Sequence, residues 1–172
     1  MTDHLNVEIK AKTNNIGFLQ NKLEEMGANY KGCDHQIDTY FHCENGRLKL
    51  REGKIENSLI FYQRSNQKGP KDSHVSMTTL SADSKIGEVL KSSYGVKVVV
   101  DKKRHIYFID NVKFHVDEVE GLGSFAEIEA IDYEGNIGQE KLLEQCQHNQ
   151  NELLIGEDDL VDCSYSDLLF QN

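Results

Sequence analysis

Several segments of this chain alternate charged and apolar residues, and this pattern limits the fold more than any other feature. The clearest are residues 8–12 (EIKAK), 47–51 (RLKLR), 113–117 (KFHVD) and 127–129 (EIE). Successive side chains of a β-strand point to opposite faces, so each segment gathers its charges on one face. Some segments are basic and others are acidic. A solvated sheet face does not need that separation, whereas a site that binds a polyanion together with a divalent metal needs both signs of charge.

The pattern predicts about eight strands and three to four helices. We expect strands near residues 4–12, 36–42, 47–52, 58–64, 74–80, 97–109, 112–120 and 125–133. Apolar residues at helical spacing predict helices over 15–26, 84–94, 138–150 and 157–170. Residues 65–73 predict a loop, because they contain the turn-forming pair Gly69-Pro70.

Two architectures fit these elements. If the charged faces point inward, the chain is an α+β protein built on a closed eight-stranded antiparallel β-barrel, a tunnel with a polar, charged lumen. Its apolar exterior is then covered by the amphipathic helices. The alternative is an open sheet with one face on helices and the other in water. The pattern alone does not decide between them.

Size and charge restrict the class of protein. The chain has 172 residues, one proline and no low-complexity tract, so we expect a single domain over residues 1–172. Its net charge of −10 argues against a nucleic-acid partner or an anionic membrane surface. A local cationic pocket is compatible with that net charge. No run approaches the ~20 apolar residues of a membrane span, and the first residues have no apolar signal core, so we expect a cytoplasmic protein. The four scattered cysteines predict reduced thiols.

The basic residues of the alternating segments predict a phosphate site. Converging cations repel each other unless an anion neutralises them, and phosphate accepts both the planar fork of Arg and the point charge of Lys. The set comprises Lys10, Lys12, Arg47, Lys49, Arg51, Lys102 and Arg104, with Arg64 and Lys113 as further members. His115 could donate to phosphate or join a polar network, and Lys71, in the expected loop, could fold over a ligand. The competing interpretation is that these charges simply face water.

The acidic residues Glu8, Asp117, Glu127 and Glu129 fall on the same strand faces as the cations or on adjacent ones. Carboxylates and a polyphosphate repel each other unless a cation lies between them. Mg²⁺ or Mn²⁺ in that position would bind the oxygens of both. The competing interpretation is a set of salt bridges to neighbouring Lys and Arg. Walker A, G-x-G-x-x-G and G-x-S-x-G sequences are absent.

These residues occur in an order that resembles the CYTH domain family, the triphosphate tunnel metalloenzymes, and especially its class IV adenylyl cyclase branch. The matching segments are NVEIKAK at 6–12, DTYF at 38–41, GRLKLR at 46–51, GPKDS at 69–73, KKR at 102–104 and VKFHVDEVEGLGSFAEIE at 112–129, followed by SYSDLL at 164–169. The resemblance implies a tunnel that binds a triphosphate with a divalent metal. It implies Glu8, Glu127 and Glu129 as metal ligands, with Asp117 as a further one. The phosphate-binding residues that it implies are Lys10, Lys12, Arg47, Lys49, Arg51, Arg64, Lys102 and Arg104.

One departure from the family concerns the metal. The family's Glu-x-Glu-x-Lys signature reads Asn6-Val7-Glu8-Ile9-Lys10 here. Asn offers a hard cation a neutral carbonyl oxygen but no charge, so the number of metals bound stays open.

The function that we expect is that of a metal-dependent enzyme acting on a small molecule that bears a triphosphate. The resemblance favours cyclisation of ATP with release of pyrophosphate, with Glu8, Lys10, Glu127 and Glu129 as catalytic residues. Hydrolysis of inorganic, thiamine or nucleoside triphosphate is an alternative, and so is a non-catalytic polyphosphate- or nucleotide-binding protein. A barrel that carries a lipophilic ligand would instead need apolar inward faces. Whether the protein forms a homodimer is open.

Overall fold

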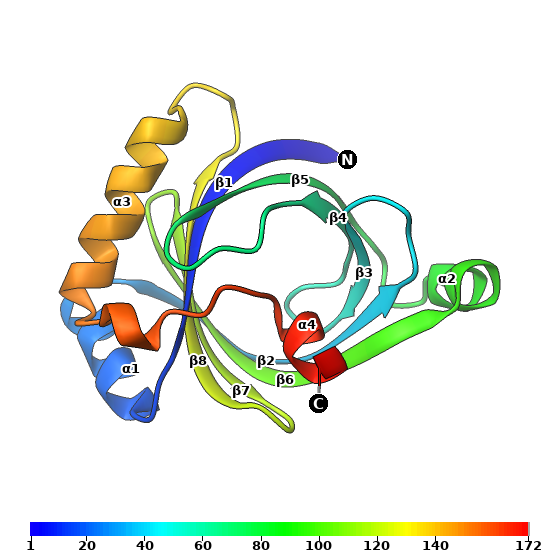
Figure 1. Cartoon of the computed structure of the whole chain (residues 1–172), viewed down its shortest axis with the longest axis horizontal. Coiled ribbons are helices and arrows are strands. Elements are labelled where there is room, and N and C mark those ends of the chain that lie inside the picture. Colours follow the sequence, from blue (N-terminus) through cyan, green and yellow to red (C-terminus); the bar gives the residue numbers. More distant parts are fainter. Residues whose placement is uncertain (172) are drawn as a thin grey trace.

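The computed structural model describes residues 1–171, and its centre is a closed barrel of eight antiparallel strands (Figure 1). The strands are β1 (Thr2–Lys12), β2 (Asn29–Phe41), β3 (Arg47–Glu52), β4 (Ser58–Gln63), β5 (Lys71–Thr79), β6 (Val96–Ile109), β7 (Val112–Val119) and β8 (Gly123–Asp132). Their order around the barrel is β1-β5-β4-β3-β2-β6-β7-β8. The ring closes because β1 pairs with β5 on one side and with β8 on the other. This closure confirms the barrel and excludes the open sheet.

Helices cover much of the apolar exterior of the barrel. Helices α1 (Ile16–Glu25) and α3 (Gln139–Glu152) lie beside β1, β7 and β8 (Figure 1). Val7 and Ile9 of β1 point outward into this layer and join Ile128, Leu23 and Leu142 in one buried cluster. The intervening residues of β1 point into the lumen, so the charged–apolar alternation separates the two faces as predicted.

A smaller apolar cluster lies under α2 (Ile86–Tyr94), where Leu90 packs against Phe41 of β2 and Leu50 of β3. Between these helical layers part of the outer face of β2 and β6 is polar: His35 Nε2 lies 2.7 Å from Asp101 Oδ1, and both side chains are exposed. Val99 on the same face of β6 is also exposed. Within residues 1–171, no helix is long and apolar enough to cross a membrane.

The C-terminal segment differs from the sequence prediction. Residues 157–170 do not form one helix; a 3-10 turn at Glu157–Asp159 is followed by extended chain and then by α4 (Tyr165–Gln171). Leu160 forms a β-bridge with Ala11, and the Val161 N–H donates to the Lys10 carbonyl at 2.8 Å. These bonds to β1 compete with a helical conformation and turn the chain toward the barrel. Figure 1 shows α4 and the segment before it lying across the ring of strands.

Two other boundaries also differ. Strand β2 begins at Asn29 rather than near residue 36, because a register shift between Tyr30 and Gly32, where Gly32 has φ +127°, breaks the alternation that marks a strand in the sequence. Strand β5 begins at Lys71, so the expected loop over 65–73 ends earlier and Lys71 is a strand residue.

Candidate active site: a charged cavity inside the barrel

The barrel surrounds a cavity that contains about 830 Å³ of space free of protein atoms, open solvent at its mouth included. The basic residues that line it are Lys10, Lys49, Arg51, Arg64, Lys102, Arg104 and Lys113. The acidic residues that line it are Glu8, Asp38, Glu127 and Glu129. The inward charged faces predicted from the sequence therefore meet in one enclosed space.

Asp38 of β2 organises three basic residues of the two neighbouring strands, β3 and β6. Its carboxylate accepts hydrogen bonds from Lys102 Nζ at 2.7 Å, Lys49 Nζ at 3.1 Å, and Arg51 Nε and Nη2 at 2.9 and 3.0 Å. Burial opposes ionisation of this carboxyl, but the charges of Arg51, Lys102 and Lys49 outweigh burial and hold its pKa well below the usual value. These contacts fix three cations toward the same region of the cavity.

Asp117 forms a second, fully buried network. It accepts hydrogen bonds from Arg104 Nε at 2.8 Å, Arg104 Nη2 at 2.5 Å and the Tyr165 hydroxyl at 2.8 Å. Burial opposes its ionisation, yet Arg104 lowers its pKa below the usual value. Both carboxylate oxygens are occupied and Asp117 does not line the cavity. Its position therefore suits orientation of Arg104 better than the metal-ligand role expected from the sequence.

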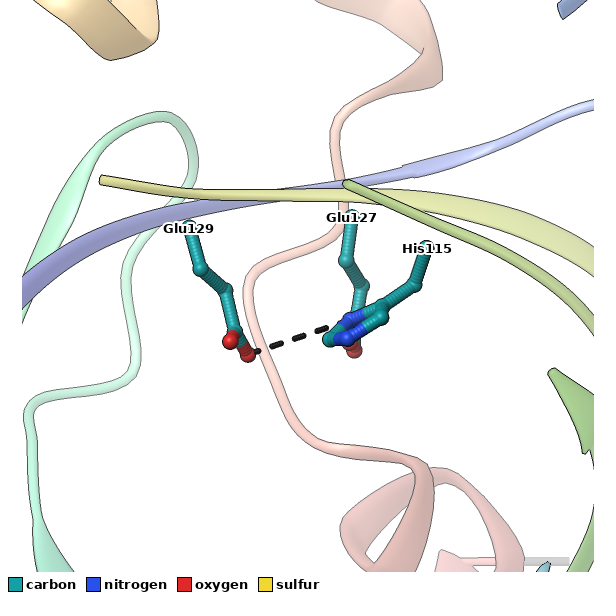
Figure 2. Close-up of side chains that lie close together, drawn as sticks. All are labelled: His115, Glu127 and Glu129. Atoms are coloured by element: carbon teal, nitrogen blue, oxygen red, sulfur yellow. Dashed lines mark hydrogen bonds and ion pairs between the residues drawn. The ribbon is translucent and has the colours of Figure 1, made fainter. Parts of the chain in front are cut away.

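Figure 2 shows that His115 of β7 approaches Glu127 and Glu129 of β8. One ligand atom from each of the three residues lies within 4.8 Å of the others. His115 Nδ1 lies 3.0 Å from Glu127 Oε2 and 4.0 Å from Glu129 Oε1. Burial, and then the charge of Arg104, hold the pKa of His115 well below its ordinary value, so the ring is neutral near pH 7. This neutral nitrogen and two carboxylates form a set that could hold a metal ion.

The two glutamates of this cluster differ in their contacts. Glu127 forms ion pairs with Lys10 and with Arg104, the latter at 2.6 Å. Glu129 makes no hydrogen bond to any residue in the described part of the chain. Glu8 lies opposite Glu129 in the β1–β8 ladder but pairs with Arg64, and it stands outside the three-residue cluster.

Four predicted substrate-binding residues do not line the cavity, and one of them is His115 of the cluster described above. Lys12 is exposed beyond its end. Arg47 donates to Asp167 and to Asn66, each at 2.8 Å. Lys71 is buried and donates to the backbone carbonyls of Gln67 and Val161. It therefore joins two segments of the backbone and does not lie in a loop that could fold over a ligand.

Several residues of the site were missed from the sequence. Asp38 and Glu56 act as counter-ions: Glu56 accepts from Arg51 Nη1 at 2.8 Å and also pairs with Lys113. Tyr165 lines the cavity, and its ring lies 3.6 Å from Lys10 Nζ. A sequence signal for this segment did exist, since Ser164-x-x-Asp167 is a helix-capping pattern and Asp167 Oδ2 accepts from Ser164 Oγ at 2.7 Å.

Comparison with known proteins places this geometry in context. The family model described as "CYTH domain" matches residues 4–165. A protein of Methanocaldococcus jannaschii, named "Putative adenylate cyclase", is 28% identical, and the match covers 95% of this chain and 98% of that protein. A solved protein of Pyrococcus horikoshii OT3 superposes with a TM-score of 0.80 at 23% identity, covering 95% and 98% of the two chains. A "putative adenylate cyclase" from Vibrio parahaemolyticus gives 0.76 at 20% identity, covering 96% and 97%. The two structural similarities show a shared fold.

Proposed function

The chain belongs to the CYTH domain family, and from this premise we propose that its cavity is the active site of a metal-dependent enzyme acting on a triphosphate. The observation that carries the proposal is the lining of the cavity, in which seven basic and four acidic side chains face one space. A surface of merely solvated charges would not be enclosed. A triphosphate with a divalent metal is complementary to both sets of charges, because its phosphate oxygens bind the basic side chains and the metal binds the carboxylates.

The donor set fits Mg²⁺ or Mn²⁺. Both are hard cations that prefer carboxylate oxygens, and Mn²⁺ also accepts an imidazole nitrogen. Glu129 is the most available ligand because no hydrogen bond within the described residues engages it. We assign Glu127 and Glu8 as its partners, with His115 beside them. Bound there, the metal would neutralise phosphate charge and favour ionisation of the attacking hydroxyl.

The basic residues would bind the phosphate oxygens. Lys49, Arg51 and Lys102 are already held by Asp38, so little reorganisation is needed when charge develops on the leaving group. Arg64 adds a buried guanidinium whose Nε has no hydrogen-bond partner within residues 1–171. Lys10, Arg104 and Lys113 would complete the set, with Lys10 exchanging its pairing with Glu127 for a phosphate oxygen.

The reaction that we propose is cyclisation of ATP, supported by the name of the M. jannaschii relative. In this reaction the ribose 3′-oxygen forms a bond to the α-phosphorus, the bond from that phosphorus to the bridging oxygen breaks, and pyrophosphate leaves. The hydroxyl proton passes to a base. The residues of the cavity bind and orient the chain of phosphates so that the attacking and leaving oxygens stand in line.

The test is ³¹P NMR of the purified protein with ATP and Mg²⁺ or Mn²⁺, repeated with inorganic triphosphate. Pyrophosphate with a cyclic phosphodiester signal supports the cyclase, whereas orthophosphate would identify a hydrolase. Shifted phosphate signals without turnover would identify a binding protein, and neither shift nor turnover would refute the proposal.

A matched pair of variants links the result to the cavity. Lys102 points into the lumen and Lys103, its neighbour on β6, is exposed on the outer face. Lys102→Met should weaken triphosphate binding and turnover at least about tenfold, the loss expected for a buried charge-assisted contact. Lys103→Met should leave both unchanged.

A further inference from the structure

The connection between β3 and β4, residues 53–57, places the carboxylate of Glu56 against two basic residues of the cavity. Glu56 Oε2 accepts a hydrogen bond from Arg51 Nη1 at 2.8 Å, and Glu56 also forms an ion pair with Lys113. Lys113 belongs to β7, and two strands, β2 and β6, separate β7 from β3 in the ring. Glu56 and Lys113 therefore meet across the lumen and not along one pair of neighbouring strands.

Asp34 of β2 fixes this connection in place. Its carboxylate is buried and accepts hydrogen bonds at 2.8, 3.1 and 3.0 Å from the backbone N–H groups of Lys54, Ile55 and Glu56. Gln36 Nε2 donates to the carboxylates of both Asp34 and Glu56 at 3.0 Å. These bonds set the position of Glu56, so it does not depend on attraction to the lysine across the lumen.

Lys113 has a second carboxylate within reach. Glu129 lies directly opposite Lys113 in the antiparallel β7–β8 ladder, and both side chains line the cavity. Opposite charges at such positions attract each other, because the Cβ atoms are only about 4.5–5.5 Å apart. Within residues 1–171, however, Lys113 forms its ion pair with Glu56, and Glu129 forms none with a lysine or an arginine. Lys113 therefore pairs with Glu56 although Glu129 is its cross-strand neighbour.

Neutralisation of buried charge does not by itself explain Glu56. Arg51 already has a bidentate partner in Asp38, whose oxygens accept from Arg51 Nε and Nη2 at 2.9 and 3.0 Å. Lys113 would have Glu129 as its partner. Each cation would thus keep a carboxylate without Glu56. The difference would lie in Glu129, which would then be paired and no longer available to a metal ion.

We propose that Glu56 is a positioning residue for the metal site: it holds the ammonium group of Lys113 away from Glu129 and keeps that carboxylate free to bind Mg²⁺ or Mn²⁺. The inference rests on the proposed function, in which Glu129 is a metal ligand. Glu56 also offsets the positive charge of Lys113, which would otherwise repel the metal ion. Replacing a residue that positions metal ligands without touching the metal typically costs about 10–100-fold in metal affinity.

The test measures Mn²⁺ affinity by electron paramagnetic resonance in the absence of substrate, so it reports on the metal site and not on turnover. Glu56→Gln keeps the size of the side chain and the backbone N–H that binds Asp34, but it releases Lys113. The affinity should fall about tenfold. In the double variant Glu56→Gln/Lys113→Met it should return close to the wild-type value, because the competing ammonium group is gone. The matched control is Glu52→Gln, an exposed residue of the same hairpin, which should leave the affinity unchanged.

The rescue separates positioning from a purely structural role. If Glu56 only stabilised the connection, Lys113→Met would not restore the metal affinity. An unchanged affinity in Glu56→Gln, or a loss without rescue, would overturn the role of Glu56 and leave the metal site in place. A wild-type protein that binds no Mn²⁺ would overturn this inference together with the metal site on which it rests. Thermal melts check folding; should Glu56→Gln fail to fold, Glu56→Asp, which keeps the charge but is one methylene shorter, should show a smaller loss with the same rescue.

Discussion

Replacing Asp38 with Asn should destabilise the barrel by about 3–5 kcal/mol, the usual cost of removing one partner from a buried ion pair. The Asp38 side chain is 2% exposed and is the shared counter-ion of Lys49, Arg51 and Lys102. Asn keeps the size of the side chain but removes its charge. The three cations would then repel each other in a region with little water.

The loss is large enough to measure by heat or urea. For a domain of this size, 1 kcal/mol corresponds to about 2–4 °C in Tm, so Asp38→Asn should lower Tm by about 6–20 °C. Asp101→Asn is the matched control, because Asp101 points outward and its side chain is 48% exposed. Its effect should stay within about 0.5 kcal/mol.

Acid and added anion give two further checks on the same variant. The pKa of Asp38 is well below its unfolded value of about 3.9, so its contribution to stability is present at neutral pH and is lost as the pH falls below that value. Wild type and variant should therefore converge in acid. Inorganic triphosphate should raise Tm more in Asp38→Asn than in the wild type, since it supplies the missing negative charge. A variant within about 2 °C of wild-type Tm, or an equal response to triphosphate, would refute the reasoning.

Three more outcomes follow from the structure. Glu129→Gln should weaken Mn²⁺ binding at least about tenfold, measured by electron paramagnetic resonance, because it removes the most available carboxylate; unchanged affinity would exclude Glu129 as a ligand. Burial, and then Arg64, lower the pKa of Lys71 to about 8, whereas an unfolded lysine has a pKa of about 10.4. The unfolded chain therefore binds more protons between these two pH values, and the free energy of unfolding of the wild type should rise with pH over that range. Lys71→Met should flatten that rise in Tm, and identical pH slopes would contradict it. Cys33 is exposed and should react with a thiol reagent in the native protein, whereas Cys146 is buried and burial raises its pKa to about 12, so its labelling should require unfolding; mass spectrometry identifies the labelled sites.

Local alternation was sufficient to predict most strands and to place their charges on one face, but it did not decide whether that face points inward. Arg51 and Lys49 fall on one face simply because strand side chains have a period of two. Closure was not predictable in this way, since the same alternation occurs in an open sheet. It depends on β1 finding partners on both sides, which is a property of distant segments.

Counter-ions were harder to predict than cations. Asp38 belongs to the site because the β2–β3 register places it opposite Arg51, and no pattern within either strand specifies that register. Asp117 followed the alternation, but its contacts with Arg104 and Tyr165 come from distant segments and were not predictable from the strand pattern. The last helix was predicted too long because the spacing of Leu160 and Leu168 suits a helix, while the bridge from Leu160 to β1 does not.

The C-terminal segment crosses the ring of strands, and its residues Ser164 and Tyr165 line the cavity. We infer that this segment covers one end of the cavity, so that substrate enters and products leave at the other end. The exposed Tyr133 stands at that other end. A substrate held with its phosphates innermost must enter tail first, and its products must leave through the same opening in sequence. After the proposed cyclisation of ATP, the cyclic product would depart before pyrophosphate. Pyrophosphate release would then limit turnover, and added pyrophosphate would inhibit by competing directly with the incoming substrate.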